Sequence, residues 1–139
     1  MHSRSELDER RRALVLEHLA GENARDIERT MRTFHRARYE IVPIGAVIDG
    51  DEAVRAMLVG QWEGLPPVTV DAETLCFGEH GVMVETRTVG TRADGAPIDM
   101  LTVNYFGFED DRLVLERCFF DRLTMAEQLG LSDTGDAAA

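Results

Sequence analysis

The sequence of 139 residues predicts an α+β fold, in which helices pack on one face of a curved antiparallel sheet. Three observations support this prediction. Apolar residues recur at helical spacing in the first half of the chain, and four β-prone runs follow one another after residue 67. Short turns rich in Gly, Asp and Glu separate these runs, as is typical of antiparallel strands.

The first two helices are expected before residue 35. The first covers residues 6–19, where apolar side chains fall near a helical period, and Gly21 is expected to end it. The second covers residues 24–34, with Asn23 as its N-cap. Both helices are therefore expected to present one apolar stripe to the core.

A short strand and a third helix are expected next. Residues 39–47 are β-prone but contain Pro43, so they are interpreted as one short strand at an edge of the sheet. The acidic stretch 49–52 begins a helix, since negative charge is favourable at a helix N-terminus. The stretch 64–67, with two prolines, ends it.

The second half of the chain is almost entirely β-prone. Asp94-Gly95 is a strong signal for a hairpin. A short helix over residues 123–129 closes the fold. One domain is expected over residues 1–131, with residues 132–139 frayed because they lack apolar anchors. The expected strands cover residues 68–77, 82–91, 97–108 and 113–120.

Composition excludes several classes of function. The net charge of −11 disfavours binding to nucleic acid or to an anionic membrane. No apolar run approaches the ~20 residues of a membrane span, and the first residues lack an apolar signal core, so a cytoplasmic location is expected. The chain has no lysine, which excludes a Schiff-base lysine.

Neither a metal nor a cofactor is expected. The histidines are scattered along the chain, without the spacing of a zinc site. Cys76 and Cys118 lie in apolar β-prone runs and lack a CxxC spacing, so both are expected to be buried free thiols.

Three stretches resemble the SnoaL-like polyketide cyclases of the nuclear transport factor 2-like superfamily. The resemblance covers roughly residues 13–131, and it implies a cone-shaped sheet packed against three N-terminal helices (a cystatin-like roll), with a homodimer formed through the outer sheet face. Two positions depart from the family pattern, Arg36-Ala37 and Leu65-Pro66-Pro67. The matching stretches are residues 22–34, residues 38–40 with 49–55, and residues 111–117 with 120–121 and 128–131.

The resemblance implies that Asp121 is the general acid/base of an intramolecular aldol closure. Its apolar neighbours would raise its pKa if the side chain pointed inward. The alternative is that Asp121 caps the following helix. His18 falls where related ketosteroid isomerases carry a tyrosine, and Asn104 falls at their oxyanion-hole acid. The position of the isomerase base falls near Val42, which has no carboxylate.

The charged residues of the strands have two interpretations. Glu85, Arg87, Glu116 and Arg117 fit cross-strand ion pairs on the outer face of the sheet. An inward-facing member would instead pair with Asp121, and a single bulge would reverse which residues point inward. Glu116 is therefore kept among the candidates for the substrate site.

These observations predict a cofactor-independent acid/base enzyme that acts on a hydrophobic carbonyl compound, as a cyclase or a related isomerase or dehydratase. Asp121 would move the proton, while Asn104 and His18 would stabilise the developing oxyanion. The alternatives are an epoxide hydrolase built on Asp99, Arg117 and Asp121, and a binding or dimerisation module without catalysis. The expected substrate-binding residues are Tyr39, Met57, Trp62, Thr102, Phe106, Glu116 and Phe120.

Overall fold

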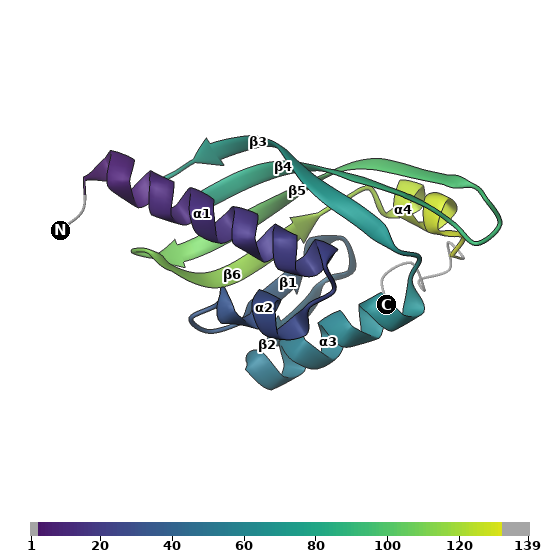
Figure 1. The fold of residues 1–139 in the computed structure, drawn as a ribbon, viewed down its shortest axis with the longest axis horizontal. Helices are drawn as coiled ribbons and strands as arrows, with labels where there is room; N and C mark the ends of the chain where they lie inside the picture. The colour runs from purple at the N-terminus through teal and green to yellow at the C-terminus, as the bar shows by residue number, and fades with distance from the viewer. Residues whose placement is uncertain (1–2, 132–139) are drawn as a thin grey trace.

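Six strands form one curved sheet in the order β2-β1-β6-β5-β4-β3, as the computed structural model shows for residues 3–131 (Figure 1). The tail that was expected to fray, residues 132–139, lies outside the described residues. Helices and strands are segregated, which confirms the predicted α+β class. The elements in chain order are α1 (Arg4–Asn23), α2 (Ile27–Arg32), β1 (Arg38–Ile41), a 3-10 turn (Val42–Ile44), β2 (Ala46–Asp49), α3 (Asp51–Gly64), β3 (Val68–Phe77), β4 (Gly81–Thr91), β5 (Pro97–Glu109), β6 (Arg112–Phe119) and α4 (Arg122–Leu129).

The segment expected to be one edge strand is two strands. Pro43, which has no N–H to donate, sits in the 3-10 turn between β1 and β2, and Gly45 completes the reversal with a left-handed backbone (φ 65°). β2 then forms the sheet edge, while β1 lies between β2 and β6 and runs parallel to β6. The sheet is therefore antiparallel except at this one pair.

The end of α1 also differs from the prediction. Gly21 does not end the helix but lies inside it, where its missing side chain lets α2 approach: a Cβ there would be 2.7 Å from Thr30 Oγ1. Asn23 does not cap α2. Its side chain joins the last residue of α1 to Val70 of β3, with bonds of 2.8 and 2.9 Å. Asp26 caps α2 instead, accepting from Arg29 N at 3.0 Å.

Two hydrophobic clusters form the core. One lies between α1 and the sheet and contains Val15, Phe106 and Leu113 among its buried members. The other lies between α2, α3 and β1, with Tyr39 and Leu58. Figure 1 shows α1 crossing the sheet. In this view α3 lies below β1, beside α2 and β2. None of the helices in residues 3–131 has the length and apolar character that a membrane crossing requires.

Two bulges change which side chains point inward. On β3 the register shifts between Ala72 and Thr74, so Leu75 faces the core and Cys76 is exposed. The expectation that Cys76 is buried is therefore wrong, whereas Cys118 is partly buried and packs against the cluster between α2, α3 and β1. On β6 Leu113 pairs with Phe108 and Leu115 with Gly107, which leaves Val114 without a partner.

Candidate active site

A largely apolar cavity of about 210 Å³ opens on the inner face of the sheet. Its walls come from the ends of α1 and α3, from all strands except β2, and from α4. The charged side chains among its described lining residues are two carboxylates, Glu22 of α1 and Glu116 of β6. The cavity is smaller than the ~300–1,000 Å³ typical of sites for drug-sized ligands, so it fits a small molecule.

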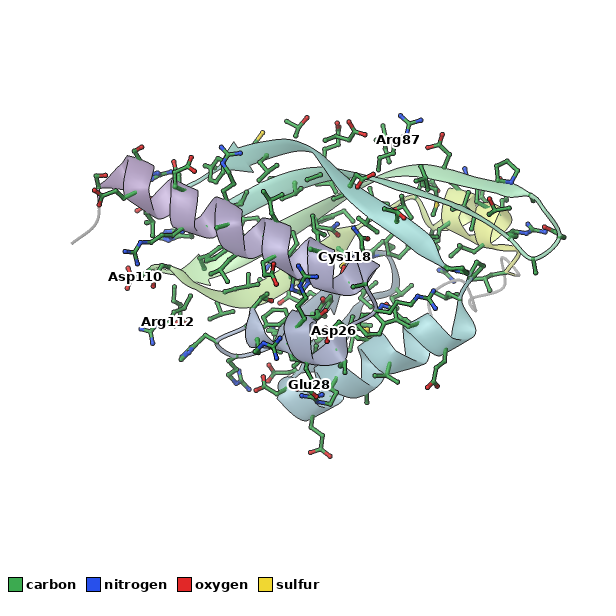
Figure 2. The ribbon with its side chains drawn as sticks, in the orientation of Figure 1. Asp26, Glu28, Arg87, Asp110, Arg112 and Cys118 are labelled. Atoms are coloured by element: carbon green, nitrogen blue, oxygen red, sulfur yellow. The ribbon has the colours of Figure 1, made fainter. Side chains whose placement is uncertain are left out.

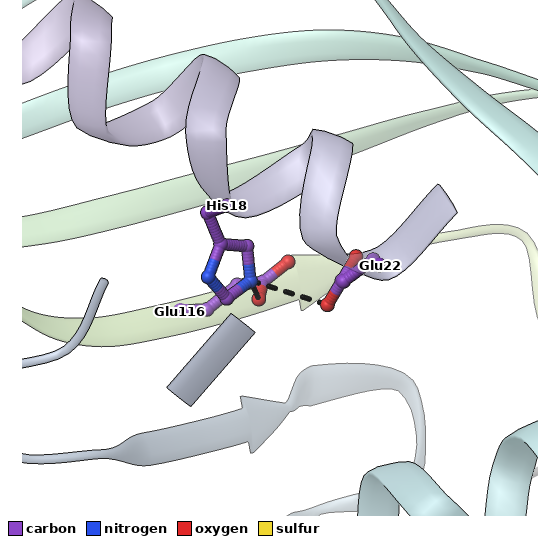
Figure 3. Close-up of side chains that lie close together, drawn as sticks. All are labelled: His18, Glu22 and Glu116. Carbon is purple, nitrogen blue, oxygen red and sulfur yellow. Dashed lines mark hydrogen bonds and ion pairs between the residues drawn. The ribbon is translucent and has the colours of Figure 1, made fainter. Parts of the chain in front are cut away.

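The two carboxylates meet at the imidazole of His18 (Figure 3). His18 Nε2 lies 3.0 Å from Glu116 Oε2 and 3.1 Å from Glu22 Oε1. The Tyr39 hydroxyl lies 3.0 Å from the same nitrogen and donates to Glu22 Oε1 at 2.8 Å. His18 and Glu22 come together because residues four apart share one face of a helix, and Tyr39 and Glu116 are register partners on the parallel strands β1 and β6.

The position of one proton on His18 follows from its other contact. Thr33 donates its hydroxyl hydrogen to the carbonyl of Thr30 at 2.7 Å. Thr33 Oγ1 can therefore only accept from His18 Nδ1, which lies 2.8 Å away. With Nδ1–H fixed in this way, Nε2 faces two carboxylates, and a second proton there forms the imidazolium.

Burial alone would lower the pKa of His18, but the charges and hydrogen bonds of Glu22 and Glu116 outweigh it and raise the pKa to about 10. His18 is therefore a cation at neutral pH. Burial raises the pKa of Glu116, the charge of Glu22 raises it further, and His18 opposes both effects only in part. For Glu22 the effect of burial is outweighed by His18 and Tyr39, so its pKa is lowered.

The same three side chains are those that could together hold a metal ion among the described residues. The ligand atoms of His18, Glu22 and Glu116 lie within 4.8 Å of one another. A metal would have to displace the proton on Nε2, since an imidazolium nitrogen has no lone pair to give. The absence of a metal stays a prediction.

Hydroxyl and amide groups line the cavity beside Glu116. Asn104 Nδ2 donates to Thr86 Oγ1 at 3.2 Å, and Thr86 Oγ1 lies 2.6 Å from Thr102 Oγ1. An amide nitrogen carries two hydrogens, so one N–H of Asn104 is available to a ligand. Asn104 of β5 pairs with Cys118 of β6, so Glu116 is its diagonal neighbour on the same face of the sheet. The Cα atoms of such neighbours are roughly 7–8 Å apart.

Five of the residues predicted from sequence to bind substrate or act on it line this cavity. They lie on β1, β5, β6 and the segment after β6, and their apolar or polar side chains face the same space. They are Tyr39, Thr102, Asn104, Glu116 and Phe120.

The other predicted residues lie elsewhere. His18 is fully buried behind the wall and reaches the cavity through Glu22 and Glu116. Phe106 is fully buried in the core, with its ring 5.5 Å from that of His18. Met57 packs in the cluster around α3, and Trp62 lines a neighbouring cavity of about 140 Å³.

Asp121 does not face the cavity. It is exposed, and its carboxylate caps α4 by accepting from Leu123 N at 3.0 Å and from Thr124 N at 3.3 Å. Bonds from Thr124 and Leu123 lower its pKa, opposite to the shift that a base near neutral pH requires. The structure thus adopts the helix-cap alternative, because β6 ends at Phe119 and Asp121 begins the next helix.

The three residues considered for epoxide hydrolysis do not meet. Asp99 pairs with Arg87 at 2.7 Å on the outer face of the sheet, and Arg117 pairs with Glu40 at 2.7 Å. Figure 2 shows Arg87 pointing away from the sheet. The expected outer-face ion pairs thus exist for Arg87 and Arg117, but Glu116 points inward and pairs with His18 rather than with Asp121.

Sequence reasoning missed the role of Glu22 and the facing of Glu116. The i,i+4 spacing of His18 and Glu22 was a usable signal, since it puts both on one helix face. No such signal exists for Glu116. Strict alternation from buried Leu113 would point Glu116 outward, and only the unpaired Val114 in β6 reverses it.

Comparisons agree with this architecture. A family model described as SnoaL-like domain matches residues 15–116. A structure described as a SnoaL-like polyketide cyclase from Jannaschia sp. CCS1 has a TM-score of 0.78 and 20% identity, over 95% of this chain and 99% of that chain. An M. tuberculosis LEH-like epoxide hydrolase has a TM-score of 0.71 and 20% identity, over 88% and 90%.

A protein with a ketosteroid isomerase-like fold from Catenulispora acidiphila, in complex with trimethylamine, has a TM-score of 0.74 and 16% identity, over 86% of this chain and 93% of that chain. At these identities the likeness establishes the fold. No curated protein matches the sequence.

Proposed function

Because the chain belongs to the SnoaL-like domain family, we propose that it is a cofactor-independent acid/base enzyme that acts on a small hydrophobic carbonyl compound, as a cyclase or isomerase. Glu116 is the group that moves the proton. One observation carries the proposal: Glu116 is 3% exposed, yet it lines an apolar cavity and contacts a buried imidazolium.

The chemistry of Glu116 fits general base catalysis. Its pKa is raised by burial and by the charge of Glu22, which makes the carboxylate a stronger base than an exposed glutamate. His18 holds Glu116 Oε2 at 3.0 Å and thereby orients the carboxylate. In this arrangement His18 positions the base and does not itself touch substrate.

In the proposed reaction, ionised Glu116 takes a proton from the carbon next to the substrate carbonyl. The C–H electron pair forms a C=C bond, and the carbonyl oxygen becomes an enolate oxygen. The free N–H of Asn104 donates to that oxygen, a kind of contact worth about 3–4 kcal/mol in known enzymes. Return of the proton to another carbon completes an isomerisation. Alternatively, attack of the enolate carbon on a second carbonyl closes a ring, and the alkoxide formed there takes the proton from Glu116, which regenerates the carboxylate.

The proton-transfer step can be tested without knowing the natural substrate. The probe is 4-phenylbutan-2-one in D2O, with deuterium incorporation beside its carbonyl followed by NMR. The wild-type protein is expected to accelerate the exchange over buffer. Glu116→Gln is expected to lose about 10²–10⁴-fold of that acceleration, since an amide cannot accept the proton.

Asp121→Asn is the matched comparison, because it tests the carboxylate that the family resemblance implied. Asparagine caps a helix about as well as aspartate, so the fold is expected to be retained. Exchange by this variant is expected to equal that of the wild type. Loss of exchange in Asp121→Asn with retention in Glu116→Gln would exchange the two roles and overturn the proposal.

A homodimer formed through the outer face of the sheet is also part of the proposed function. Apolar side chains are exposed there on β4, β5 and β6, namely Met83, Leu101 and Phe119. A patch of this kind is typical of interaction surfaces.

A further inference from the structure

The charges at the cavity do not balance. Glu22 and Glu116 bring two carboxylates to its wall, and His18 brings the single cation that contacts them. Among the described lining residues none is a lysine, arginine or histidine. With His18 protonated and both carboxylates ionised, one negative charge in a largely buried, apolar setting remains uncompensated, and such a charge is costly.

No nearby arginine supplies the missing charge. Arg25 lines the adjacent smaller cavity, where its guanidinium donates to the carbonyl of Trp62 at 2.7 Å. Arg117 is the neighbour of Glu116 on β6, but it points outward to Glu40. The groups that face Glu116 are His18 and Glu22 from α1, Tyr39 from β1 and Cys118 on β6, and of these only His18 is cationic.

Each carboxylate also has an oxygen to spare. The hydrogen bonds within the cluster use Glu22 Oε1 and Glu116 Oε2. The second oxygen of each side chain takes no part in these bonds, and both residues line the cavity. A ligand with N–H donors can therefore be held by charge-assisted hydrogen bonds, which are stronger than neutral ones.

From this arrangement we infer that the cavity selects a cationic ligand, a protonated amine carried on the small apolar body of the carbonyl compound, whose ammonium Glu22 binds through its free oxygen and Glu116 attracts through its charge. The inference rests on the proposed function in taking this cavity as the substrate site, and it names the class of substrate. Anionic molecules such as carboxylates and phosphates are excluded by the same charges.

The charge of the ligand and the protonation state of Glu116 are then linked. Without ligand, the excess negative charge favours a proton on Glu116. A bound ammonium compensates the same charge, so ligand binding favours the ionised carboxylate, which is the form that the proposed proton transfer requires. Amine affinity is therefore expected to rise with pH across the range in which Glu116 titrates, as long as the amine stays protonated.

Three probes of matched shape test the charge preference: benzylamine, benzyl alcohol and benzoate, compared by calorimetric titration at pH 7. Benzylamine is expected to bind at least about tenfold more tightly than benzyl alcohol, and benzoate more weakly than either. Equal affinities, or a preference for benzoate, would overturn the inference.

Variants separate the contribution of each carboxylate. Glu22→Gln is expected to abolish most of the preference for benzylamine, whereas Glu85→Gln, on the outer face of the sheet, should keep it. If Glu22→Gln does not fold, the probe series on the wild type still decides the question.

Failure of amine selectivity and failure of Glu116 as the base give different results. These titrations need no turnover, so they test amine selectivity independently of catalysis. Selective amine binding together with full deuterium exchange in Glu116→Gln would reject Glu116 as the base and leave the ligand class intact.

Discussion

At the scale of single residues, His18 combines a fixed tautomer with a strong electrostatic bias. Thr33 fixes Nδ1–H, and Glu22 and Glu116 favour a proton on Nε2. A histidine inside an apolar core would ordinarily be neutral, since burial disfavours charge. Here two carboxylates reverse that tendency and favour the imidazolium at neutral pH.

This charge predicts how stability depends on pH. The pKa of His18 is about 10 in the fold against about 6.5 when unfolded, so its contribution is complete below pH 6.5 and is lost as pH rises toward 10. One unit of pKa corresponds to about 1.4 kcal/mol, so the loss is expected to be on the order of a few kcal/mol. Urea denaturation at a series of pH values measures it.

His18→Gln provides the comparison for that series. The variant is expected to be less stable at pH 7, but its free energy of unfolding should depend less on pH between 6.5 and 8.5. This range avoids the raised pKa of Cys118, which acts in the same direction at higher pH. Parallel pH curves for the two proteins would show that His18 is not charged in the fold.

At the scale of elements, the close contact of α1 with α2 depends on Gly21. The buried Thr30 of α2 leaves no room for a side chain there, because a Cβ would lie 2.7 Å from its Oγ1 and 3.0 Å from its amide nitrogen. This contact explains why the structure tolerates a glycine inside a helix. The same packing brings Thr33, just after α2, against His18.

Two glycine-to-alanine variants separate the effect of close packing at Gly21 from the general effect of helix propensity. Gly21→Ala is expected to destabilise the protein by about 1–3 kcal/mol through overpacking. Gly60→Ala, in α3 with nothing within 4 Å of its added Cβ, is expected to stabilise by up to about 1 kcal/mol. Urea denaturation of both variants measures the difference. Stabilisation by both would mean that α2 moves away without cost.

At the scale of the whole molecule, the polar cluster lies where the two hydrophobic clusters meet. The ring of His18 contacts Phe106 from one cluster at 5.5 Å and Phe34, which packs against both, at 5.1 Å. The imidazole thus packs edge-on against two aromatic rings. The carboxylates of the polar cluster face the cavity while its imidazole stays out of solvent.

The exposed apolar side chains on the outer face of the sheet predict a contact between two copies of the chain. Leu101 of β5 is 60% exposed and pairs with Arg87 of β4 on that face. If the face forms the proposed homodimer, Leu101→Asp is expected to shift the mass in sedimentation from two chains to one. Leu16→Asp, on the solvent side of α1, is the control and should not change it. A wild-type protein that sediments as one chain would contradict the prediction.

The approximate extents of the last four strands and the fold class could be predicted from the sequence, because both depend on local patterns. The strand 68–77 is found with the predicted bounds, and Thr102 and Asn104, both predicted for the site, line the cavity from β5. Alternation, turn residues and family resemblance were sufficient for these features.

Tertiary structure decided which of two carboxylates faces the cavity. Asp121 and Glu116 are both carboxylates near the end of the last strand, and local sequence favours neither. The extra residue Val114 turns Glu116 inward, and the end of β6 at Phe119 leaves Asp121 to cap α4. Strand facing follows from register, and register is set by long-range pairing, so the carboxylate that shares a cavity with Asn104 emerges only when the sheet is assembled.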